Sequence, residues 1–125
     1  MITIKAADVY VVADESKITQ VAYNLINNAI NYTGEDKLVR IKQVIDGDKV
    51  RIEVHDTGVG IPKNQLQHIW ERYYKINDAH KRFKQGSGIG LSIVKGIMEL
   101  HNERYGVSSI PGSGSVFWFE LSVCN

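Results

Sequence analysis

The amino-acid sequence predicts an α+β fold, a two-layer α/β sandwich in which a mixed, mostly antiparallel sheet packs on about three helices. Three features lead to this prediction. Two β-rich runs flank a DG turn, two segments show the period of an amphipathic helix, and a strand pair closes the chain. Strands and helices do not alternate as in βαβ units, so the helices are expected on one face of the sheet. The chain of 125 residues has the size of one domain.

The first third of the chain is expected to form short strands and then a long helix. Residues 2–14, ITIKAADVYVVAD, contain alternating and β-branched residues, which predict one or two short strands. Asp14 or Ser16 is the expected N-cap of a helix that runs to Tyr32 and is ended by Gly34. Its apolar side chains fill one broad arc, comprising Ile18, Val21, Ala22, Leu25, Ile26, Ala29 and Ile30.

The middle of the chain predicts a hairpin and a short helix. LVRIKQVI (38–45) and KVRIEVHD (49–56) flank Asp46-Gly47-Asp48, a strong hairpin signal. Pro62 is typical of the first turn of a helix, so PKNQLQHIW (62–70) is expected to be helical.

The last part of the chain predicts a loop, a helix and two strands. Residues 71–85 are charged and aromatic without a clear period, which indicates a mobile loop. IGLSIVKGIMELH (89–101) has the pattern of a second amphipathic helix. YGVSSI (105–110) and SVFWFELSV (115–123) are expected to pair around PGSGS.

Composition excludes several classes of function. Fifteen Lys and Arg against fourteen Asp and Glu give a net charge of +1, which provides no overall attraction to nucleic acid or to an anionic membrane. The single cysteine, Cys124, excludes an internal disulfide and a thiolate metal site, and fits a reducing compartment. No apolar run approaches the roughly 20 residues of a membrane span, and no signal-peptide pattern begins the chain.

Asp56 is an unexpected carboxylate at the end of a predicted strand. It falls in phase with Val50, Ile52 and Val54, so its side chain is expected to point toward the core. A buried carboxylate needs a donor, and an amine of a ligand approaching the TGVGIP turn would supply one. The alternative is that Asp56 only caps the turn with an Asx bond to its own backbone.

A second glycine stretch, GSGIGLS (86–92), runs directly into a predicted helix. The amides and dipole of a helix N-terminus favour phosphate, and glycines allow close approach. A plain turn is the alternative. No strand precedes the glycines and no GxxxxGK[ST] motif is present, so neither a dinucleotide fingerprint nor that type of phosphate loop fits.

Two polar features lie near these glycine stretches. Asn24, Asn28 and Asn31 fall within about 60° on one helix face, so their amides could converge on an oxygen-coordinated ion such as Mg²⁺. The alternative is the wet face of an amphipathic helix, and this reading is favoured for Asn27. The basic and aromatic residues of IWERYYKIN and the following loop suit a positive lid near phosphate, or else a solvated basic loop, the favoured reading for residues 81–84.

In combination, these motifs resemble a known family. Asn28-Ala29, DTGVGI, IWERYYK, GSGIGLSIV and PGSGS, in this order over nearly the whole chain, resemble the ATP-binding catalytic domain of sensor histidine kinases, within the GHKL superfamily. The resemblance implies a Bergerat fold over residues 1–125, with ATP and Mg²⁺ held between the asparagine helix and a flexible lid at about 70–87.

The resemblance also implies roles for individual residues. Asn28 matches the magnesium ligand, Asn24 lies beside the phosphates, Tyr32 stacks on adenine and Asp56 accepts the adenine amino group. The remaining positions match residues that shape the adenine pocket, reach the phosphates or form the lid hinge and phosphate box: Gly58, Gly60, Lys75, Gly86, Gly88, Gly90 and Leu91. No residue matches a general base.

Two departures from the family pattern are present. Asn31 stands where many members carry Lys or Arg, which shifts the positive charge toward Lys75 or Arg72, and His101-Asn102-Glu103 replaces the common HGG. Related ATPases and serine kinases carry a glutamate general base where this chain has Asn24, and an amide cannot take a proton. We therefore expect an ATP-dependent protein-histidine kinase.

The phosphoacceptor is expected on another domain. None of the four histidines has the sequence context of an acceptor, so the chain looks like the excised catalytic half of a longer protein, without autophosphorylation of its own. It is expected to be the cytoplasmic domain of a membrane-anchored sensor kinase. Its expected partners are an upstream helical dimerisation domain carrying the histidine and, indirectly, a response regulator, with no nucleic acid and no membrane contact. The alternatives are a nucleotide-binding regulatory module without transfer activity and a GHKL ATPase or serine kinase.

Overall fold

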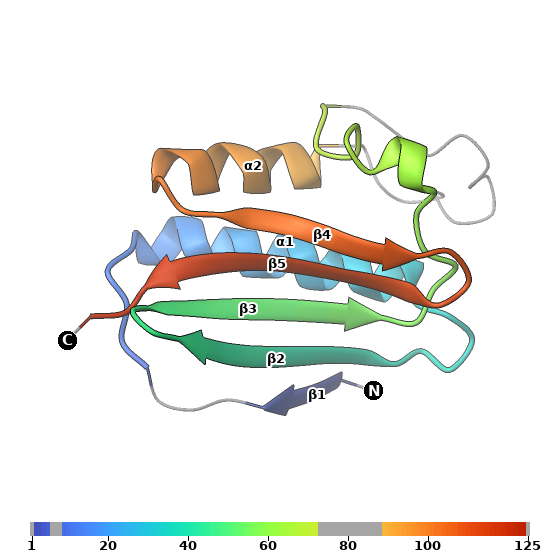
Figure 1. Ribbon diagram of the computed structural model, residues 1–125, viewed down its shortest axis with the longest axis horizontal. Coiled ribbons are helices and arrows are strands. Elements are labelled where there is room, and N and C mark those ends of the chain that lie inside the picture. The colour runs from blue at the N-terminus through green and yellow to red at the C-terminus, as the bar shows by residue number, and fades with distance from the viewer. Residues whose placement is uncertain (1, 6–8, 73–88, 125) are drawn as a thin grey trace.

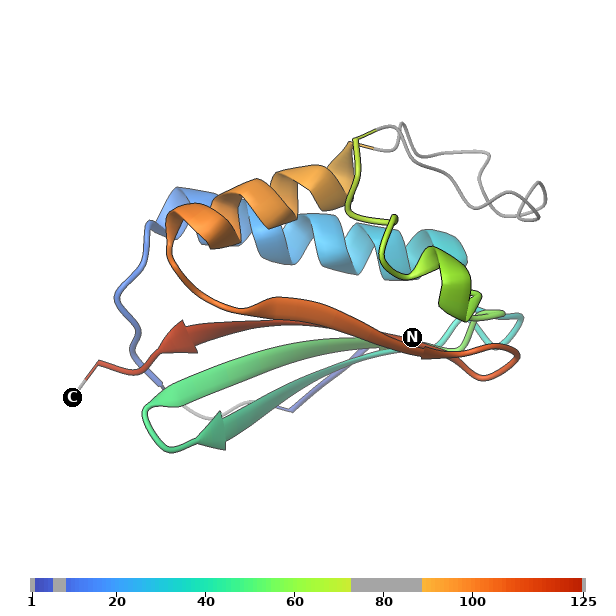
Figure 2. The same ribbon diagram turned by 45° about the horizontal axis from the view of Figure 1, so that its top comes forward.

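The protein is a two-layer sandwich of one sheet and two α-helices. The computed structural model describes residues 2–5, 9–72 and 89–124. Figures 1 and 2 show both α-helices on the same face of the sheet. The elements are β1 (Ile2–Lys5), α1 (Glu15–Tyr32), β2 (Val39–Asp46), β3 (Lys49–Asp56), the 3₁₀ turn η1 (Lys63–Gln65), α2 (Gly90–Leu100), β4 (Tyr105–Ile110) and β5 (Gly114–Ser122).

The sheet has five strands in the order β1-β2-β3-β5-β4. β1 pairs with β2 in parallel, and the other three pairings are antiparallel. The β2–β3 hairpin closes through Gly47-Asp48, with Asp46 opposite Lys49 and a φ of 62° at Gly47. A positive φ is what a two-residue hairpin turn requires, and glycine adopts it without strain. The predicted fold class, a mixed and mostly antiparallel sheet backed by helices, is confirmed.

Helix α1 forms where the apolar period predicts it. Its N-cap is Asp14, whose Oδ1 accepts a hydrogen bond from the backbone N–H of Lys17 at 3.0 Å. Val21, Leu25 and Ala29 are completely buried and pack on the sheet. Ile30, which the sequence assigned to the same arc, is 49% exposed. It lies about 100° around the helix from Ala29, outside the stripe that reaches the sheet.

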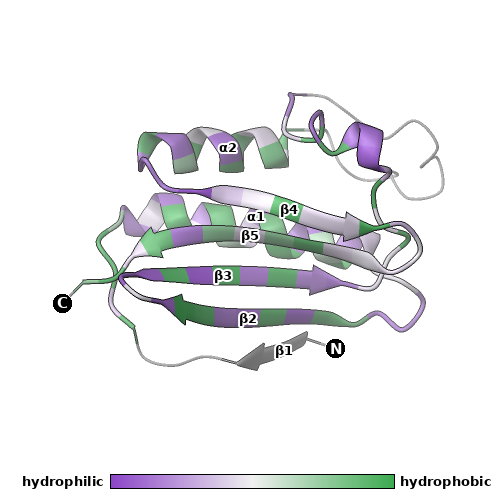
Figure 3. Ribbon diagram, viewed as in Figure 1, coloured by the Kyte–Doolittle hydropathy of each residue, from purple (hydrophilic) through white to green (hydrophobic). Residues whose placement is uncertain are grey.

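The core fills the space between the helices and the sheet. Hydrophilic and hydrophobic residues alternate along β2 and β3 (Figure 3), as expected for strands with one covered face. The buried side chains of the sheet and of α2 that complete this core are Val39, Val50, Val54, Phe117, Phe119, Leu121, Val94, Ile97 and Met98. None of the helices in the described part of the chain is long and apolar enough to cross a membrane.

The short helix predicted over residues 62–70 is present as a 3₁₀ helix of three residues, so its predicted length is wrong. Residues 62–70 contain only the 3₁₀ turn η1, and successive turns continue with bonds three residues apart, such as His68 N–H to Gln65 O at 3.0 Å. A run of about nine residues is too short to form a stable α-helix without packing along its length. Here Ile69 is buried and Trp70 packs on the core, so the segment is anchored at its end.

Glu103, part of the His101-Asn102-Glu103 stretch that replaces the common HGG, connects the α2–β4 turn to the sheet. Its Oε1 pairs with Lys49 Nζ at 2.6 Å, and its Oε2 accepts from the backbone N–H of Ser122 at 2.8 Å and from the Ser122 hydroxyl at 2.9 Å. Burial opposes ionisation of Glu103. The hydrogen bonds from Lys49 and Ser122 outweigh it and hold the pKa of this carboxyl below its ordinary 4.5.

Glu103→Gln is expected to lower stability in a pH-dependent way. Because the pKa is lower in the folded state, the ionised carboxylate stabilises the fold above the unfolded value of 4.5, and this contribution disappears as the pH falls through the folded pKa. Urea unfolding should show a loss of roughly 1 kcal/mol at about pH 7 and a smaller loss at about pH 3. The exposed Glu35→Gln is the matched control, and an equal loss at both pH values would contradict the assignment.

Candidate functional site

Helix α1 brings its asparagines against the start of α2. Asn24 is half-buried, and its Nδ2 donates to the carbonyl oxygen of Gly90, the first residue of α2, at 3.4 Å. The two residues are 66 positions apart in the sequence. The asparagine helix and the glycine-rich stretch, predicted to serve one ligand, are therefore in direct contact.

Asn28 lies one turn beyond Asn24 and has an unsatisfied polar atom. Its Nδ2 is buried and has no hydrogen-bond partner among the described residues. A buried amide without a partner loses roughly 1–3 kcal/mol of solvation, so such groups are rare outside sites that receive a ligand. Asn31 is half-buried and Asn27 is exposed. The surface interpretation of Asn27 agrees with this exposure.

Asp56 is buried at the end of β3. Its side chain lies on the sheet face that carries Val54, is only 6% exposed, and accepts a hydrogen bond through Oδ1 from the backbone N–H of Gly58 at 2.9 Å. The Asx bond considered from the sequence is thus present. It does not exclude a ligand role, because a carboxylate offers about four acceptor positions.

The glycines of the DTGVGI loop are required by the protein's own packing. A Cβ on Gly58 would collide with the carbonyl oxygen of Tyr32 at the end of α1. Gly60 has a φ of 79°, and a Cβ there would lie 2.6 Å from the carbonyl oxygen of Ile110. The sequence-based interpretation was that these glycines admit a ligand ring. The structure shows that the absence of a Cβ at both positions allows the loop to pack closely between α1 and the β4–β5 hairpin. This packing holds the loop next to Asp56.

The N-terminus of α2 receives no side-chain cap from its N-cap residue. Its N-cap, Ile89, provides no side-chain hydrogen bond, and the nearby Ser92 hydroxyl donates to the Ile89 carbonyl instead. Gly90 and Leu91 occupy the first two helical positions, and the space beside Gly90 is open. A helix N-terminus without a side-chain cap suits an anion. Asn24 on α1 contacts this end of the helix, and Asn28 lies one turn further along α1.

Several predicted residues lie outside the described part of the chain. Lys75, Gly86 and Gly88 are among them, so their roles stay predictions, as does most of the predicted lid. At the start of that lid, Trp70 packs edge-on against Tyr105 and Phe117, with ring centroids 4.9 Å and 5.9 Å apart. Arg72 is exposed. The first residue of the predicted lid, Trp70, therefore packs on side chains of β4 and β5.

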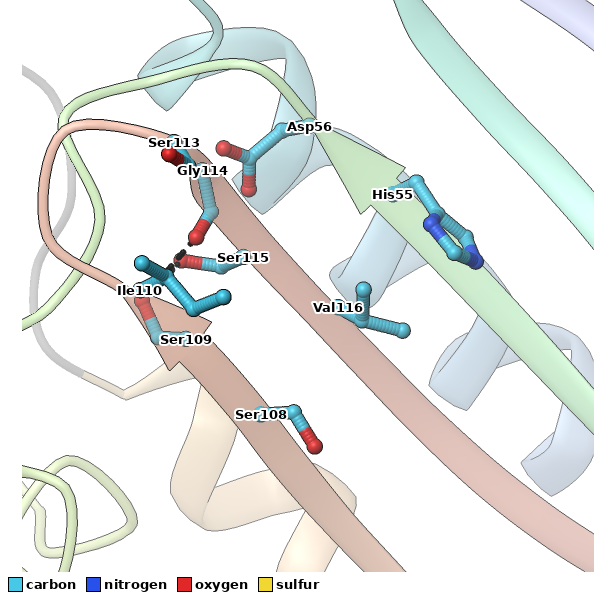
Figure 4. Close-up of a pocket in the computed structure, with 9 residues that line it drawn as sticks. All are labelled: His55, Asp56, Ser108, Ser109, Ile110, Ser113, Gly114, Ser115 and Val116. Carbon is cyan, nitrogen blue, oxygen red and sulfur yellow. Dashed lines mark hydrogen bonds between the residues drawn. The ribbon is translucent and has the colours of Figure 1, made fainter.

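A cavity of about 170 Å³ lies beside Asp56 at the β4–β5 turn (Figure 4). Register places His55, Ser108 and Val116 on the sheet face that the helices leave uncovered. By the same register, Asp56, Ser109 and Ser115 lie on the helix-covered face, so the cavity is lined from both faces of the sheet. It shares Asp56 with the predicted nucleotide site, but none of the predicted asparagines lines it. Its lining residues are His55, Asp56, Ser108, Ser109, Ile110, Ser113, Gly114, Ser115 and Val116.

One group of polar side chains near Asp56 was missed from the sequence. Thr33, Asp36 and Thr57 form hydrogen bonds beside the DTGVGI loop. They lie in two turns with no periodic signal, and only the polar composition after Tyr32 hinted at a loop. The fold brings them together.

The chain matches one family model over residues 13–125, described as histidine kinase-, DNA gyrase B-, and HSP90-like ATPase. It is 39% identical over 110 residues to sensor protein kinase WalK of Staphylococcus saprophyticus, covering 86% of this chain and 18% of that protein. It is 36% identical over 104 residues to an uncharacterized sensor-like histidine kinase of Rhizobium meliloti, covering 83% and 20%. The chain thus spans about a fifth of the length of these curated relatives.

Solved structures agree with this assignment. The catalytic domain of histidine kinase ThkA superposes with a TM-score of 0.80 at 31% identity, covering 97% of this chain and 76% of that one. Full-length ShkA in complex with AMPPNP superposes with a TM-score of 0.78 at 28% identity, covering 99% and 25%. The chain therefore belongs to the histidine kinase-, DNA gyrase B- and HSP90-like ATPase family, and within it to the ATP-binding catalytic domains of sensor histidine kinases.

Proposed function

We propose that this domain binds ATP with Mg²⁺ and donates the γ-phosphoryl group to a histidine on a separate domain of the same protein. The observation that supports this most strongly is the contact of Asn24 with the uncapped start of α2, beside the unsatisfied Nδ2 of Asn28. Backbone donors and amide side chains gathered at one helix N-terminus fit a polyphosphate. The similar protein ShkA is described in complex with AMPPNP, which agrees with a nucleotide site in this fold.

The adenine end of this site is assigned to Asp56 and Tyr32. The buried Asp56 carboxylate is held by Gly58, and its remaining acceptor capacity suits the exocyclic amine of adenine. Tyr32 ends α1 next to the same loop, since its carbonyl oxygen lies against Gly58. Adenine and phosphate contacts would thus lie along one face of α1, in the order Tyr32, Asn28, Asn24.

The residues present fit a magnesium ion held largely by the nucleotide. Within the described ranges no cluster of three His, Cys, Asp or Glu side chains is placed to hold a metal. Mg²⁺ usually keeps several waters and binds one or two protein oxygens together with phosphates. Rotation of the Asn28 side-chain amide exchanges its oxygen and its unpartnered nitrogen. One orientation offers the metal an oxygen, and the other offers phosphate a donor. When bound, the ion would neutralise charge on the transferring phosphates.

Transfer to histidine is favoured over hydrolysis or serine phosphorylation by the chemistry of Asn24. Its amide nitrogen is committed to the Gly90 carbonyl, and an amide has no useful basicity. A neutral imidazole is itself nucleophilic, so it does not depend on a base to the extent that water or serine does. Phosphoryl transfer relies mainly on positioning and charge stabilisation, which amides and helix N–H groups can supply. No general base is assigned.

The acceptor histidine is placed on another domain. The described histidines are all engaged locally: His55 with Glu53 at 2.9 Å, His68 with Glu71 at 2.8 Å, and His101 with the backbone N–H of Asp14 at 3.1 Å. The curated relatives are about five times as long as the matched region, which leaves room for a helical acceptor domain in them. A response regulator would then take the phosphoryl group, in the cytoplasm.

The test is transfer between separate domains. Incubated with γ-labelled ATP and Mg²⁺, the isolated chain should remain unlabelled. A supplied histidine-bearing helical domain from the same kinase should become labelled, and its His→Ala variant should not. Label on this chain alone would contradict the proposed division of labour.

The same experiment separates the alternatives. Nucleotide binding without any transfer to the cognate helical domain would favour a regulatory module. Steady phosphate release by the isolated chain would favour an ATPase of the same superfamily. Absence of a thermal shift with ATP and Mg²⁺ would contradict nucleotide binding altogether.

A further inference from the structure

A chain of hydrogen bonds ties the α1–β2 loop to the residue after Asp56. The Thr57 hydroxyl donates to Asp36 Oδ1 at 2.5 Å, and the same oxygen accepts from the backbone N–H of Leu38 at 3.1 Å. The Thr33 hydroxyl donates to the Leu38 carbonyl at 2.8 Å and lies 3.2 Å from the Thr57 hydroxyl. Thr33 is the C-cap of α1, so the network spans the helix end, the loop and the turn after β3.

The direction of these hydrogen bonds is determined by Asp36. An ionised carboxylate only accepts, so the single hydroxyl proton of Thr57 must point at Asp36. The same hydrogen bond holds the pKa of Asp36 below its ordinary 3.8, so it favours the ionised carboxylate that accepts this bond. Without that carboxylate, Thr57 would be free to donate to Thr33 or to water, and the tether would be lost.

The tethered segment carries Asp56, the proposed adenine contact. Asp56 and Gly58 flank Thr57 and are joined by the Asx bond of 2.9 Å. A Cβ on Gly34 would lie 2.6 Å from the Thr57 carbonyl oxygen, so the α1–β2 loop presses directly on this turn. Both Asp36 and Thr57 are exposed, which means their hydrogen bond is made at the surface and contributes nothing to the core.

We propose that Asp36 is a positioning residue of the nucleotide site, which acts through the Thr57 hydroxyl to hold the Asp56–Gly58 turn in its binding geometry. This inference rests on the proposed nucleotide function. Asp36 itself touches no nucleotide in this arrangement. Its effect is transmitted by one side-chain hydrogen bond and one turn of backbone.

The direction in which Asp36→Ala changes the affinity for ATP distinguishes a positioning role from a purely electrostatic one. Asp36 carries a negative charge, and ATP is a polyanion, so by charge alone Asp36→Ala would strengthen ATP binding. Positioning predicts the opposite, a weaker complex. We expect Asp36→Ala to raise the Kd for ATP·Mg²⁺ by about 3- to 10-fold, the effect of one hydrogen bond. Asp36→Asn, whose amide oxygen can still accept from Thr57 and Leu38, should restore most of the affinity.

The experiment is a double-mutant cycle read by isothermal titration calorimetry. The variants are Asp36→Ala, Thr57→Val and the pair, with Thr57→Ser as the variant that keeps the hydroxyl. Glu35→Ala is the matched control, because it removes the same charge from the neighbouring exposed position. If Asp36 acts through Thr57, the pair should bind no more weakly than Thr57→Val alone. Thr57→Ser should bind as wild type does, and every variant is titrated well below its own melting temperature, so that the affinities refer to the folded protein.

The outcomes separate the inference from the proposed function. Wild-type affinity in Asp36→Ala, tighter binding, or full additivity in the pair would overturn the positioning role while leaving nucleotide binding intact. Equal weakening by Glu35→Ala would do the same, because it would assign the effect to local charge. Absence of ATP binding by the wild type would overturn the proposed function itself.

Discussion

Asp56→Asn is expected to weaken ATP binding by about 10- to 100-fold and to remove most of the preference for ATP over GTP. A hydrogen bond to a charged group contributes about 1.5–3 kcal/mol, which corresponds to this range. Asn is isosteric with Asp, so its amide oxygen can keep the bond from Gly58, which is 2.9 Å long in the wild type. The amide nitrogen then occupies the position that faces the base.

The change in selectivity has a specific physical cause. In the proposed site, the wild-type carboxylate would accept from the adenine amine and repel the guanine carbonyl, whereas the asparagine amide nitrogen would oppose the amine and match the carbonyl. Calorimetric titration of ATP and GTP in Mg²⁺ measures both affinities. Asp46→Asn is the control, since Asp46 also ends a strand but is exposed. Equal affinity of the wild type for ATP and GTP would remove Asp56 from the base pocket.

Asn28→Ala is expected to abolish most of the magnesium dependence of nucleotide binding, with a loss of at least about 10-fold in affinity at saturating Mg²⁺. The variant removes both the amide oxygen proposed for the metal and the buried Nδ2 that lacks a partner. Because that nitrogen is unsatisfied without ligand, its removal should leave the unliganded protein at least as stable. A functional loss without a loss of stability is the expected result.

The control for this variant is one residue away. Asn27→Ala makes the same change in helix propensity at an exposed position of the same helix. Titrating Mg²⁺ at fixed ATP should leave Asn27→Ala unchanged and shift the Asn28→Ala curve. Coincident magnesium curves for Asn28→Ala and the wild type would exclude Asn28 as the metal residue.

Local patterns were sufficient for most of the fold. The 3.6-residue period predicted α1 and α2, and the DG turn between alternating strands predicted the β2–β3 hairpin. The 62–70 segment failed because a proline start and a few apolar residues do not distinguish a short α-helix from a 3₁₀ turn. The prediction that Ile30 belongs to the apolar arc did not predict its exposure, because periodicity defines the arc and only packing decides how much of it the sheet covers.

The sequence alone determined the family, the order of the elements and the residue types at the site, because period, turn chemistry and motif order are local properties of the chain. The tertiary structure decided which of the site residues contact one another. It placed Asn24 against Gly90, left Asn28 Nδ2 buried without a partner among the described residues, and packed the DTGVGI loop on α1 at Gly58. It also joined Asp36 to Thr57 across 21 positions. Such contacts depend on how two turns approach each other, and no local pattern encodes that distance.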